Sequence, residues 1–231
     1  FPTDFKVDHL LMECTYGDRP HDDISRAVEE LKQVVTRTIK RGGKVIIPAF
    51  SVGRTQTLVY YLNQFMSGGE IPKIPVFVDS PLATSASEIY RRHPECYDEE
   101  TWEFISQYRH PALEFDQLTY THSVEESKAL NMRKDPMVII SASGMVEAGR
   151  ILHHVKNNID DERNTILIVS WQAPHTLGRR LADRDKEVRI FGETYFRKAQ
   201  VETINGFSAH AGQGGLIDYA RSVAGQAKQI I

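Results

Sequence analysis

The chain has 231 residues, 41% of them hydrophobic, which is enough for one large domain or two small domains with buried cores. Its 28 basic and 31 acidic residues give a formal net charge of -3, so any nucleic acid must bind to a local basic patch. The two cysteines are too few for a disulfide framework and are typical of a reducing compartment, and no apolar run approaches the roughly 20 residues of a membrane span. We therefore expect a cytoplasmic protein with no membrane partner.

Apolar segments and turn residues predict strands that alternate with helices along the chain. Strands are expected at residues 7–13, 44–50, 75–79, 118–122, 137–140, 165–170 and 188–191. Helices are expected from a cap at Asp22 or Asp23 to a stop at Gly42 and Gly43, over residues 55–66, from Pro81 onward, and from a capping box at Ser123 to about Met132. Residues 94–117 are less periodic and are interpreted as a helical insertion. The alternation predicts an α/β fold with a parallel or mixed sheet flanked by helices.

The stretch over residues 137–154 is typical of a buried strand that leads through small residues into a helix. Its first four residues are continuously apolar, residues 141–144 are Ser, Ala, Ser and Gly, and apolar residues then recur at helical spacing from Val146 to Val155. Backbone N–H groups at the start of such a helix would converge at the end of the strand, which is the outline of an anion-binding site. An ordinary strand-to-helix turn is the alternative interpretation.

Three predicted strands end in small or polar turns, at residues 51–54, at Ser80 and at residues 142–144. In open sheets ligands bind at the carboxyl ends of the strands, so we expect these turns to share one edge. Backbone N–H groups, hydroxyls and the Arg54 guanidinium suit phosphate, and the set predicts a phosphate-lined groove. A purely structural role for each turn is the alternative. Neither a GxxxxGK[ST] loop nor a GxGxxG loop occurs in the sequence.

Histidine spacing gives no local metal-binding motif. His153 and His154 are adjacent on a predicted helix and point in different directions, so we expect one to pack and the other to be solvated. The sequence contains no HxH, no HExxH and no closely spaced pair of cysteines. His210 differs because small residues from Gly206 to Gly212 hold it in a tight turn. The spacing leaves both a structural and a functional role open for it.

Six motifs occur in a fixed order across nearly the whole chain. They are residues 13–19 (ECTYGDR), 48–54 (PAFSVGR), 79–83 (DSPLA), 141–149 (SASGMVEAG), 176–179 (TLGR) and 206–211 (GFSAHA). Together they resemble the β-CASP branch of the metallo-β-lactamase superfamily. Within that branch the pattern is most similar to RNA-processing nucleases related to the cleavage and polyadenylation endonuclease.

The resemblance implies a nuclease in which a hydroxide bridging two zinc ions attacks an RNA phosphodiester bond, in a cleft between a β-CASP and a metallo-β-lactamase domain. Glu13 falls on the first β-CASP motif and His210 on the second, and an imidazolium held by a carboxylate can stabilise or protonate the departing oxygen. Glutamate at the first motif resembles the RNA-acting members. The residues assigned to RNA or phosphate binding are Ser51, Gly53, Arg54, Ser143, Gly144 and Arg179.

The sequence also departs from the family's pattern. The HxHxDH motif and two further metal ligands would precede the first residue, and the third β-CASP histidine would follow Ile231. We therefore expect a fragment, with residues 1–19 from the metallo-β-lactamase domain, 20–192 as the β-CASP domain and 193–231 returning into the metallo-β-lactamase domain. Such a fragment would carry none of the principal zinc ligands and would be inactive by itself. Gly212 stands where many relatives have aspartate, which puts the hydrogen bonding of that turn in doubt.

Two other functions remain open from the sequence. One is a non-catalytic RNA-binding or scaffold subunit of the same fold, against which the intact Glu13 and His210 argue. The other is an unrelated phosphate- or nucleotide-binding α/β module. The sequence does not choose between an endonuclease and an exonuclease, does not identify the RNA, and leaves open whether the full-length protein forms a homodimer.

Overall fold

The computed structural model describes residues 7–20, 23–224 and 227–231. The chain divides into two compact units. The central unit spans Val28–Ile204, and the terminal unit combines residues up to 27 with residues from 205 onward. The central unit is therefore an insertion in the sequence of the terminal unit. The domain limits expected from the sequence, after residues 19 and 192, stay a prediction, because compactness by itself does not define a domain limit.

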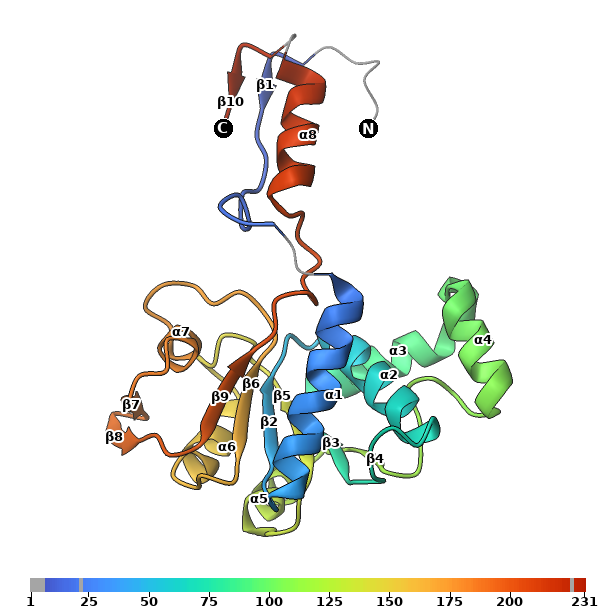
Figure 1. The fold of residues 1–231 in the computed structure, drawn as a ribbon, viewed down its shortest axis with the longest axis vertical. Helices are drawn as coiled ribbons and strands as arrows, with labels where there is room; N and C mark the ends of the chain where they lie inside the picture. Colours follow the sequence, from blue (N-terminus) through green and yellow to red (C-terminus); the bar gives the residue numbers. More distant parts are fainter. Residues whose placement is uncertain (1–6, 21–22, 225–226) are drawn as a thin grey trace. The chain divides into compact units, whose positions relative to one another are not determined.

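The centre of the central unit is a six-stranded sheet in which every strand is parallel to its neighbours (Figure 1). The strand order is β4-β3-β5-β2-β6-β9. The strands are β2 (Val45–Pro48), β3 (Val76–Val78), β4 (Leu118–Tyr120), β5 (Val138–Ser141), β6 (Thr165–Ile168) and β9 (Gln200–Thr203). A separate antiparallel hairpin joins β7 (Glu187–Ile190) to β8 (Glu193–Phe196). The predicted α/β fold is confirmed.

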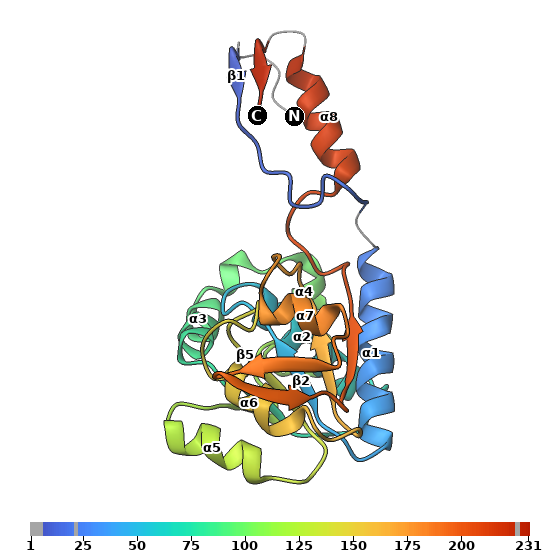
Figure 2. The same cartoon turned by 90° about the vertical axis from the view of Figure 1, so that its left-hand side faces the viewer.

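The helices of the central unit cover both faces of this sheet. They are α1 (Ile24–Lys40), α2 (Arg54–Ser67), α3 (Pro81–Arg92), α4 (Glu99–Tyr108), α5 (Val124–Met132), α6 (Ile151–Asn158) and α7 (Leu177–Ala182). Apolar residues of α5, α6 and α7 form one core cluster with Ile46, Ile139 and Ile166 of the sheet. α1 lies on the opposite face (Figure 2), where the Thr38 hydroxyl is 2.6 Å from that of Thr165. None of the described helices is both long enough and apolar enough to cross a membrane.

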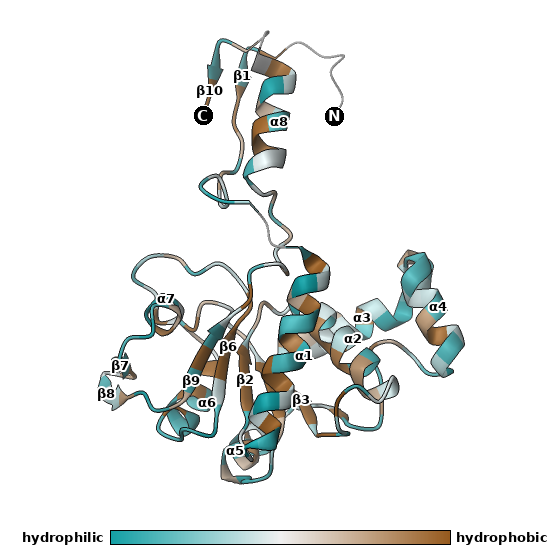
Figure 3. Ribbon diagram, viewed as in Figure 1, coloured by the Kyte–Doolittle hydropathy of each residue, from teal (hydrophilic) through white to brown (hydrophobic). Residues whose placement is uncertain are grey.

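Covering both faces explains why the strands are apolar without alternation (Figure 3). Every residue of β2, β5 and β6 is buried. α1 has the opposite pattern, because its buried Leu31, Val35 and Thr38 recur at helical spacing while the outward positions are polar. These two patterns are the reason that the strands and the first helix could be predicted from the sequence.

Residues 94–117, predicted as a helical insertion, contain a short 3-10 helix, η1 (Pro94–Cys96), followed by α4. Asp98 caps α4 by accepting a backbone hydrogen bond at 2.9 Å. Phe104 is buried, and its ring packs edge-on against the Tyr60 ring of α2 with centroids 5.5 Å apart. Aromatic contacts therefore attach the insertion to α2.

The segment between β5 and α6 departs from the prediction. α6 begins only at Ile151, and residues 142–150 form a loop in which Val146 and Gly149 have φ angles of 59° and 84°. Val146 is buried in the core cluster, and this burial, rather than a helical turn, produced the apparent helical spacing. The first N–H group of α6, that of Ile151, donates to the Ala142 carbonyl at 3.3 Å. The predicted start of this helix was therefore wrong, and anion binding at the end of β5 stays a prediction.

The terminal unit joins segments from both ends of the sequence. β1 (His9–Leu10) pairs in parallel with β10 (Gln229–Ile230), and α8 (Gln213–Ala224) precedes β10. A further parallel bridge joins Tyr16 to Gly212. The first predicted strand is therefore present but shorter than expected, because only two of its residues have a strand partner.

A fully buried carboxylate, that of Asp79, lies at the end of β3. Asp79 accepts hydrogen bonds from four side chains of other segments: Thr121, Ser127 at 2.5 Å, Arg150 at 2.7 Å and His154 at 2.5 Å. Burial would raise the pKa of Asp79, but these hydrogen bonds, that from His154 foremost, outweigh burial and hold the pKa below its usual range. The expected difference between the adjacent histidines is confirmed, since His154 is buried and His153 is exposed.

Replacing Asp79 with Asn should lower the free energy of unfolding at neutral pH by about 3 kcal/mol, because Arg150 and His154 lose their buried negative partner. Urea unfolding would measure this loss. The control is Asp183→Asn, which removes an exposed ion pair with Arg179 and should cost less than about 0.5 kcal/mol. Equal stabilities of the wild type and Asp79→Asn would contradict a stabilising role for the buried carboxylate.

The same variant should show the pH dependence of the Asp79 contribution. Because the pKa of Asp79 is lower in the folded than in the unfolded protein, its stabilisation is fully present above the unfolded pKa of about 4 and is lost as the pH falls. The stability difference between wild type and Asp79→Asn should therefore shrink from about pH 5 toward about pH 3.

Candidate active site and phosphate-binding edge

Glu13 and His210 meet in the terminal unit. Glu13 follows β1, His210 lies in the turn before α8, and the Glu13 Oε2 atom is 3.3 Å from the His210 Nδ1 atom. The Ala211 N–H donates to Glu13 Oε1 at 3.2 Å, and the Thr15 N–H donates to Glu13 Oε2 at 2.9 Å. The predicted approach of these two residues is confirmed, whereas their catalytic role is a separate question.

The surroundings of Glu13 keep it ionised. A hydrogen bond from the Thr15 N–H is the main cause that lowers the pKa of Glu13 to about 2, with smaller contributions from the Thr15 hydroxyl, the Ala211 N–H and the charge of His210. The Glu13 carboxylate faces Nδ1 of the His210 ring. Nε2 is then the nitrogen that can exchange a proton with a substrate. The two side chains are 40% and 54% exposed, so a substrate can reach them.

Backbone and amide contacts hold the two segments of the pair together. The Gln213 N–H donates to the Arg19 carbonyl at 3.1 Å, and the Gln213 side chain donates to the Gly17 carbonyl at 2.9 Å. The Tyr16 ring is buried, with its centroid 6.3 Å from that of His210. Gln213 could not be predicted from the sequence, because its partners are nearly 200 residues away. Its two bonds fix the register between the Glu13 and His210 turns.

In the central unit, the turns that follow three strands share one edge of the sheet. Pro48 of β2 lies opposite Ser141 of β5, so the turns after these strands begin side by side. The Ser51 hydroxyl is 3.2 Å from the Ser80 hydroxyl, which links the turn after β2 to the turn after β3. The position of a Cβ atom on Gly144 would be 3.1 Å from the Phe50 ring. The expected gathering of these turns at one edge is confirmed.

Several residues predicted to bind phosphate at this edge already have structural contacts. The Ser143 hydroxyl accepts hydrogen bonds from two N–H groups of its own loop, at 3.2 Å and 3.3 Å. Arg179 forms an exposed ion pair with Asp183 at 2.9 Å. Gly53 has a φ angle of 77° and precedes α2, which begins at the half-buried Arg54. Phosphate binding by these residues stays a prediction.

Two residues that were not predicted from the sequence hold the loop after β5 in place by hydrogen bonds. The buried Gln172 side chain donates to the Gly144 carbonyl at 3.0 Å, and Glu147 accepts a hydrogen bond from the Leu177 N–H at 2.5 Å. A Cβ atom on Gly178 would be 1.7 Å from the Gln172 side-chain oxygen, so this approach requires glycine. These two hydrogen bonds hold the loop after β5 against the segment that leads into α7. No short motif encodes them, because each joins segments about 30 residues apart.

Residues 7–20, 23–224 and 227–231 contain no group of three or more His, Cys, Asp and Glu side chains that could hold a metal ion. Two-zinc chemistry requires several such ligands at each ion. The described residues therefore do not fit a zinc centre by themselves, and ligands for zinc would have to come from elsewhere.

Comparison with known families agrees with this geometry. Residues 55–181 match the family model described as the Beta-Casp domain, and residues 195–231 match the one described as the Zn-dependent metallo-hydrolase RNA specificity domain. The first match covers more than half of the chain. The chain therefore belongs to the β-CASP family, and the resemblance inferred from the six motifs is confirmed.

Individual relatives are similar over almost the whole chain. It is 39% identical over 213 residues to ribonuclease TTHA0252 of Thermus thermophilus, covering 92% of this chain and 49% of the relative. It is 34% identical over 235 residues to the transcription termination factor FttA of Lokiarchaeum sp., covering 98% of this chain and 36% of the relative. It is 29% identical over 228 residues to an RNase J-like protein of Methanocaldococcus jannaschii, covering 98% and 52%. The chain thus spans about a third to a half of the length of these relatives.

The Glu13 pKa can be tested by following its carboxyl carbon chemical shift against pH, with Glu13→Gln used to assign the resonance. We expect a midpoint of about 2. Thr15→Ala should raise the midpoint because it removes the hydroxyl hydrogen bond and leaves the N–H bond in place. His210→Ala should raise it less, since the charge of His210 is the smallest of the causes. A wild-type midpoint at the usual glutamate value would contradict the contacts with Thr15.

Proposed function

We propose that this chain is the β-CASP portion of a zinc-dependent ribonuclease that hydrolyses RNA phosphodiester bonds. The observation that carries the proposal is the contact between Glu13 and His210, in which an ionised carboxylate lies 3.3 Å from an exposed imidazole. Membership of the β-CASP family and the match to an RNA specificity domain support RNA as the substrate. Relatives named as a ribonuclease and as an RNase J-like protein support hydrolysis.

His210 would assist the oxygen that leaves the phosphorus atom. Glu13 lies beside Nδ1 of the ring, and in the proposed step Nε2 carries the hydrogen that meets the substrate. In the transition state this hydrogen would bond to the departing oxygen and then be transferred to it. Glu13 does not exchange the proton in this scheme; it orients the ring and compensates its charge.

The edge of the central sheet would bind the RNA backbone. Arg54 supplies a cation at the start of α2, and Ser51, Gly53, Ser143 and Gly144 supply hydroxyl and N–H groups around it. Arg179 would join them by exchanging Asp183 for a phosphate, since an exposed ion pair of this kind is worth at most about 1 kcal/mol. Neutral and cationic donors of this kind contact phosphate without reading the base sequence.

Family membership removes the alternative of an unrelated nucleotide-binding module. A non-catalytic RNA-binding or scaffold subunit of the same fold differs from the proposal in one measurable respect, because it would bind RNA and leave it intact. Assays of the full-length protein therefore decide between these two functions.

His210→Ala in the full-length protein should lower kcat at least about 100-fold and change the Kd for RNA less than about threefold, because the proposed bond matters chiefly in the transition state. Single-turnover cleavage and equilibrium binding would measure the two quantities. His153→Ala removes an exposed histidine of the central unit and should leave both unchanged. Parallel losses of binding and turnover in His210→Ala would contradict the assigned role.

Arg54→Ala should weaken RNA binding and reduce the slope of log K against log salt by about 1, because one phosphate contact is lost. Binding measured over a range of salt concentrations tests this. Arg37→Ala serves as the control. It removes a cation of α1 that pairs with Glu202 of β9, and it should keep the wild-type slope. An unchanged slope in Arg54→Ala would exclude a phosphate contact by this residue.

A further inference from the structure

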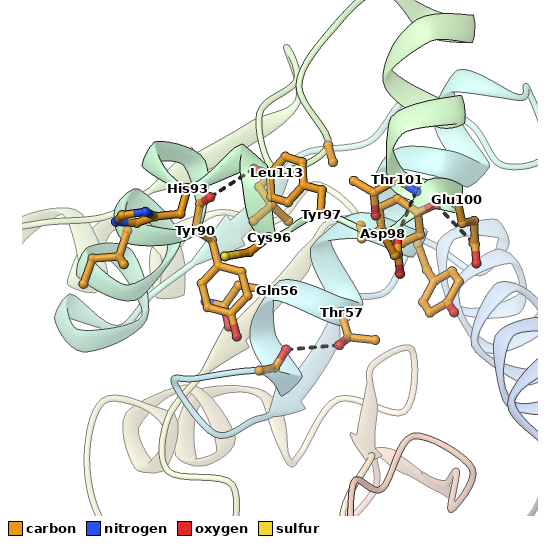
Figure 4. Close-up of a pocket in the computed structure, with 15 residues that line it drawn as sticks. Gln56, Thr57, Tyr90, His93, Cys96, Tyr97, Asp98, Glu100, Thr101 and Leu113 are labelled. Carbon is orange, nitrogen blue, oxygen red and sulfur yellow. Dashed lines mark hydrogen bonds between the residues drawn. The ribbon is translucent and has the colours of Figure 1, made fainter.

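A groove of about 640 Å³ lies between α2 and the segment that runs from α3 through η1 to α4. Figure 4 shows Tyr90 and Tyr97 on that segment and Gln56 and Thr57 on α2. Four of its lining residues are tyrosines, and we call this site the tyrosine groove: Tyr60, Tyr61, Tyr90 and Tyr97, with the carboxylates of Asp98 and Glu100. Its volume is that of a typical small-ligand site.

The lining of the groove does not suit a negatively charged phosphate and does suit a planar neutral ring. None of its described lining residues is lysine or arginine, and two are acidic. Tyrosine rings provide flat apolar surfaces on which bases stack. Burial and the neighbouring Glu100 raise the pKa of Tyr60, so its hydroxyl stays protonated and neutral.

The polar groups of the groove are mainly hydrogen-bond acceptors. Glu100 uses one oxygen to accept a hydrogen bond from the Tyr60 hydroxyl at 3.2 Å. Asp98 uses one oxygen to accept the Thr101 N–H at 2.9 Å. Asp98 also receives a side-chain hydrogen bond from Thr101, whereas Glu100 retains a second oxygen for a ligand. The amide oxygen of the buried Gln56 also has no hydrogen-bond partner among the described residues. The carboxylates favour a ligand with N–H donors.

The groove is continuous with the candidate phosphate-binding edge. Gly53 lines the groove and also belongs to the turn of residues 51–54 after β2. Its φ angle of 77° favours glycine, and a Cβ atom there would meet no neighbouring atom. A strand with a phosphate on this turn would have the adjacent base within reach of the tyrosines.

We propose that the tyrosine groove binds a guanine base of the RNA substrate, stacked on Tyr90 and hydrogen-bonded by its N1–H and N2–H groups to Glu100 or Asp98. Guanine is chosen because it presents two adjacent donor groups, which match a carboxylate, whereas adenine and cytosine present one amino group and uracil one N–H. This inference rests on the proposed ribonuclease function and adds a base preference to it. It predicts that a guanine is favoured beside the bound backbone.

The test measures binding of labelled uridine heptamers that carry one central guanosine or one central inosine, which lacks the N2 amino group. Wild-type protein should bind the guanosine oligomer about tenfold more tightly, because a hydrogen bond to a charged group is lost with inosine. In the double variant Asp98→Asn/Glu100→Gln the two oligomers should bind equally. Asn and Gln keep an oxygen for Thr101 and Tyr60, so the fold is preserved.

Stacking is tested separately with Tyr90. Tyr90→Ala should weaken binding of the guanosine oligomer about tenfold, and Tyr90→Phe should restore it, since phenylalanine retains the ring face. Phe196→Ala, which removes an exposed aromatic ring of β8, should have no effect. Thermal unfolding of each variant would verify folding.

The outcomes separate this inference from the proposed function. Equal binding of the guanosine and inosine oligomers by the wild type, with cleavage intact, would overturn the guanine site and leave the ribonuclease unaffected. A guanosine preference that depends on Glu100 or Asp98, in full-length protein that leaves RNA uncut, would support the groove and contradict hydrolysis. If Tyr90→Ala bound the RNA oligomer as tightly as the wild type and instead lost affinity for a peptide, the guanine site would also be overturned.

Discussion

The arrangement of the central unit depends on one buried negative charge. Asp79 lies at the end of β3, and its carboxylate receives side chains from the segment after β4, from α5, and from the start and body of α6. Its carbonyl accepts the Ser141 hydroxyl of β5 at 2.7 Å. A buried carboxylate is costly unless it is hydrogen-bonded on all sides, so these segments can take only positions that bring donors to it. The turns at the ends of β3 and β5 are thereby fixed relative to each other.

The candidate phosphate-binding edge next to Asp79 is made chiefly of backbone. Ser143 uses its hydroxyl to cap its own loop, and Gln172 and Glu147 hold that loop against α7. These contacts hold the loop in one conformation before any ligand binds. The edge is therefore a preformed surface, and Arg54 and Arg179 are the groups that could respond to an approaching chain. A rigid protein loop beside mobile arginine side chains suits binding to a sugar-phosphate backbone, which is the same in every sequence.

The sequence predicted the elements whose patterns are local. Continuous apolar runs identified β2 and β5, and the capping box at Ser123 is present at the start of α5. The loop of residues 142–150 failed because Val146 is buried outside any helix, which periodicity cannot distinguish from a helical position. The partners of Asp79 span residues 121–154 with no shared spacing, so the network could not be foreseen. Glu13 and His210 were found from the order of family motifs, because no spacing joins residues so far apart.

The parallel pairing of β1 with β10 has a consequence for biosynthesis. Glu13 is translated before the central sheet, whereas the Ala211 N–H that binds its carboxylate lies 198 residues later. All strands of the central sheet have been translated by Thr203, and domains generally fold as units while synthesis continues. The carboxylate and imidazole can therefore come together only after every strand of the central sheet has been translated. A nascent chain that stalls between Thr203 and His210 has every strand of its parallel sheet translated, while its candidate catalytic pair cannot yet form.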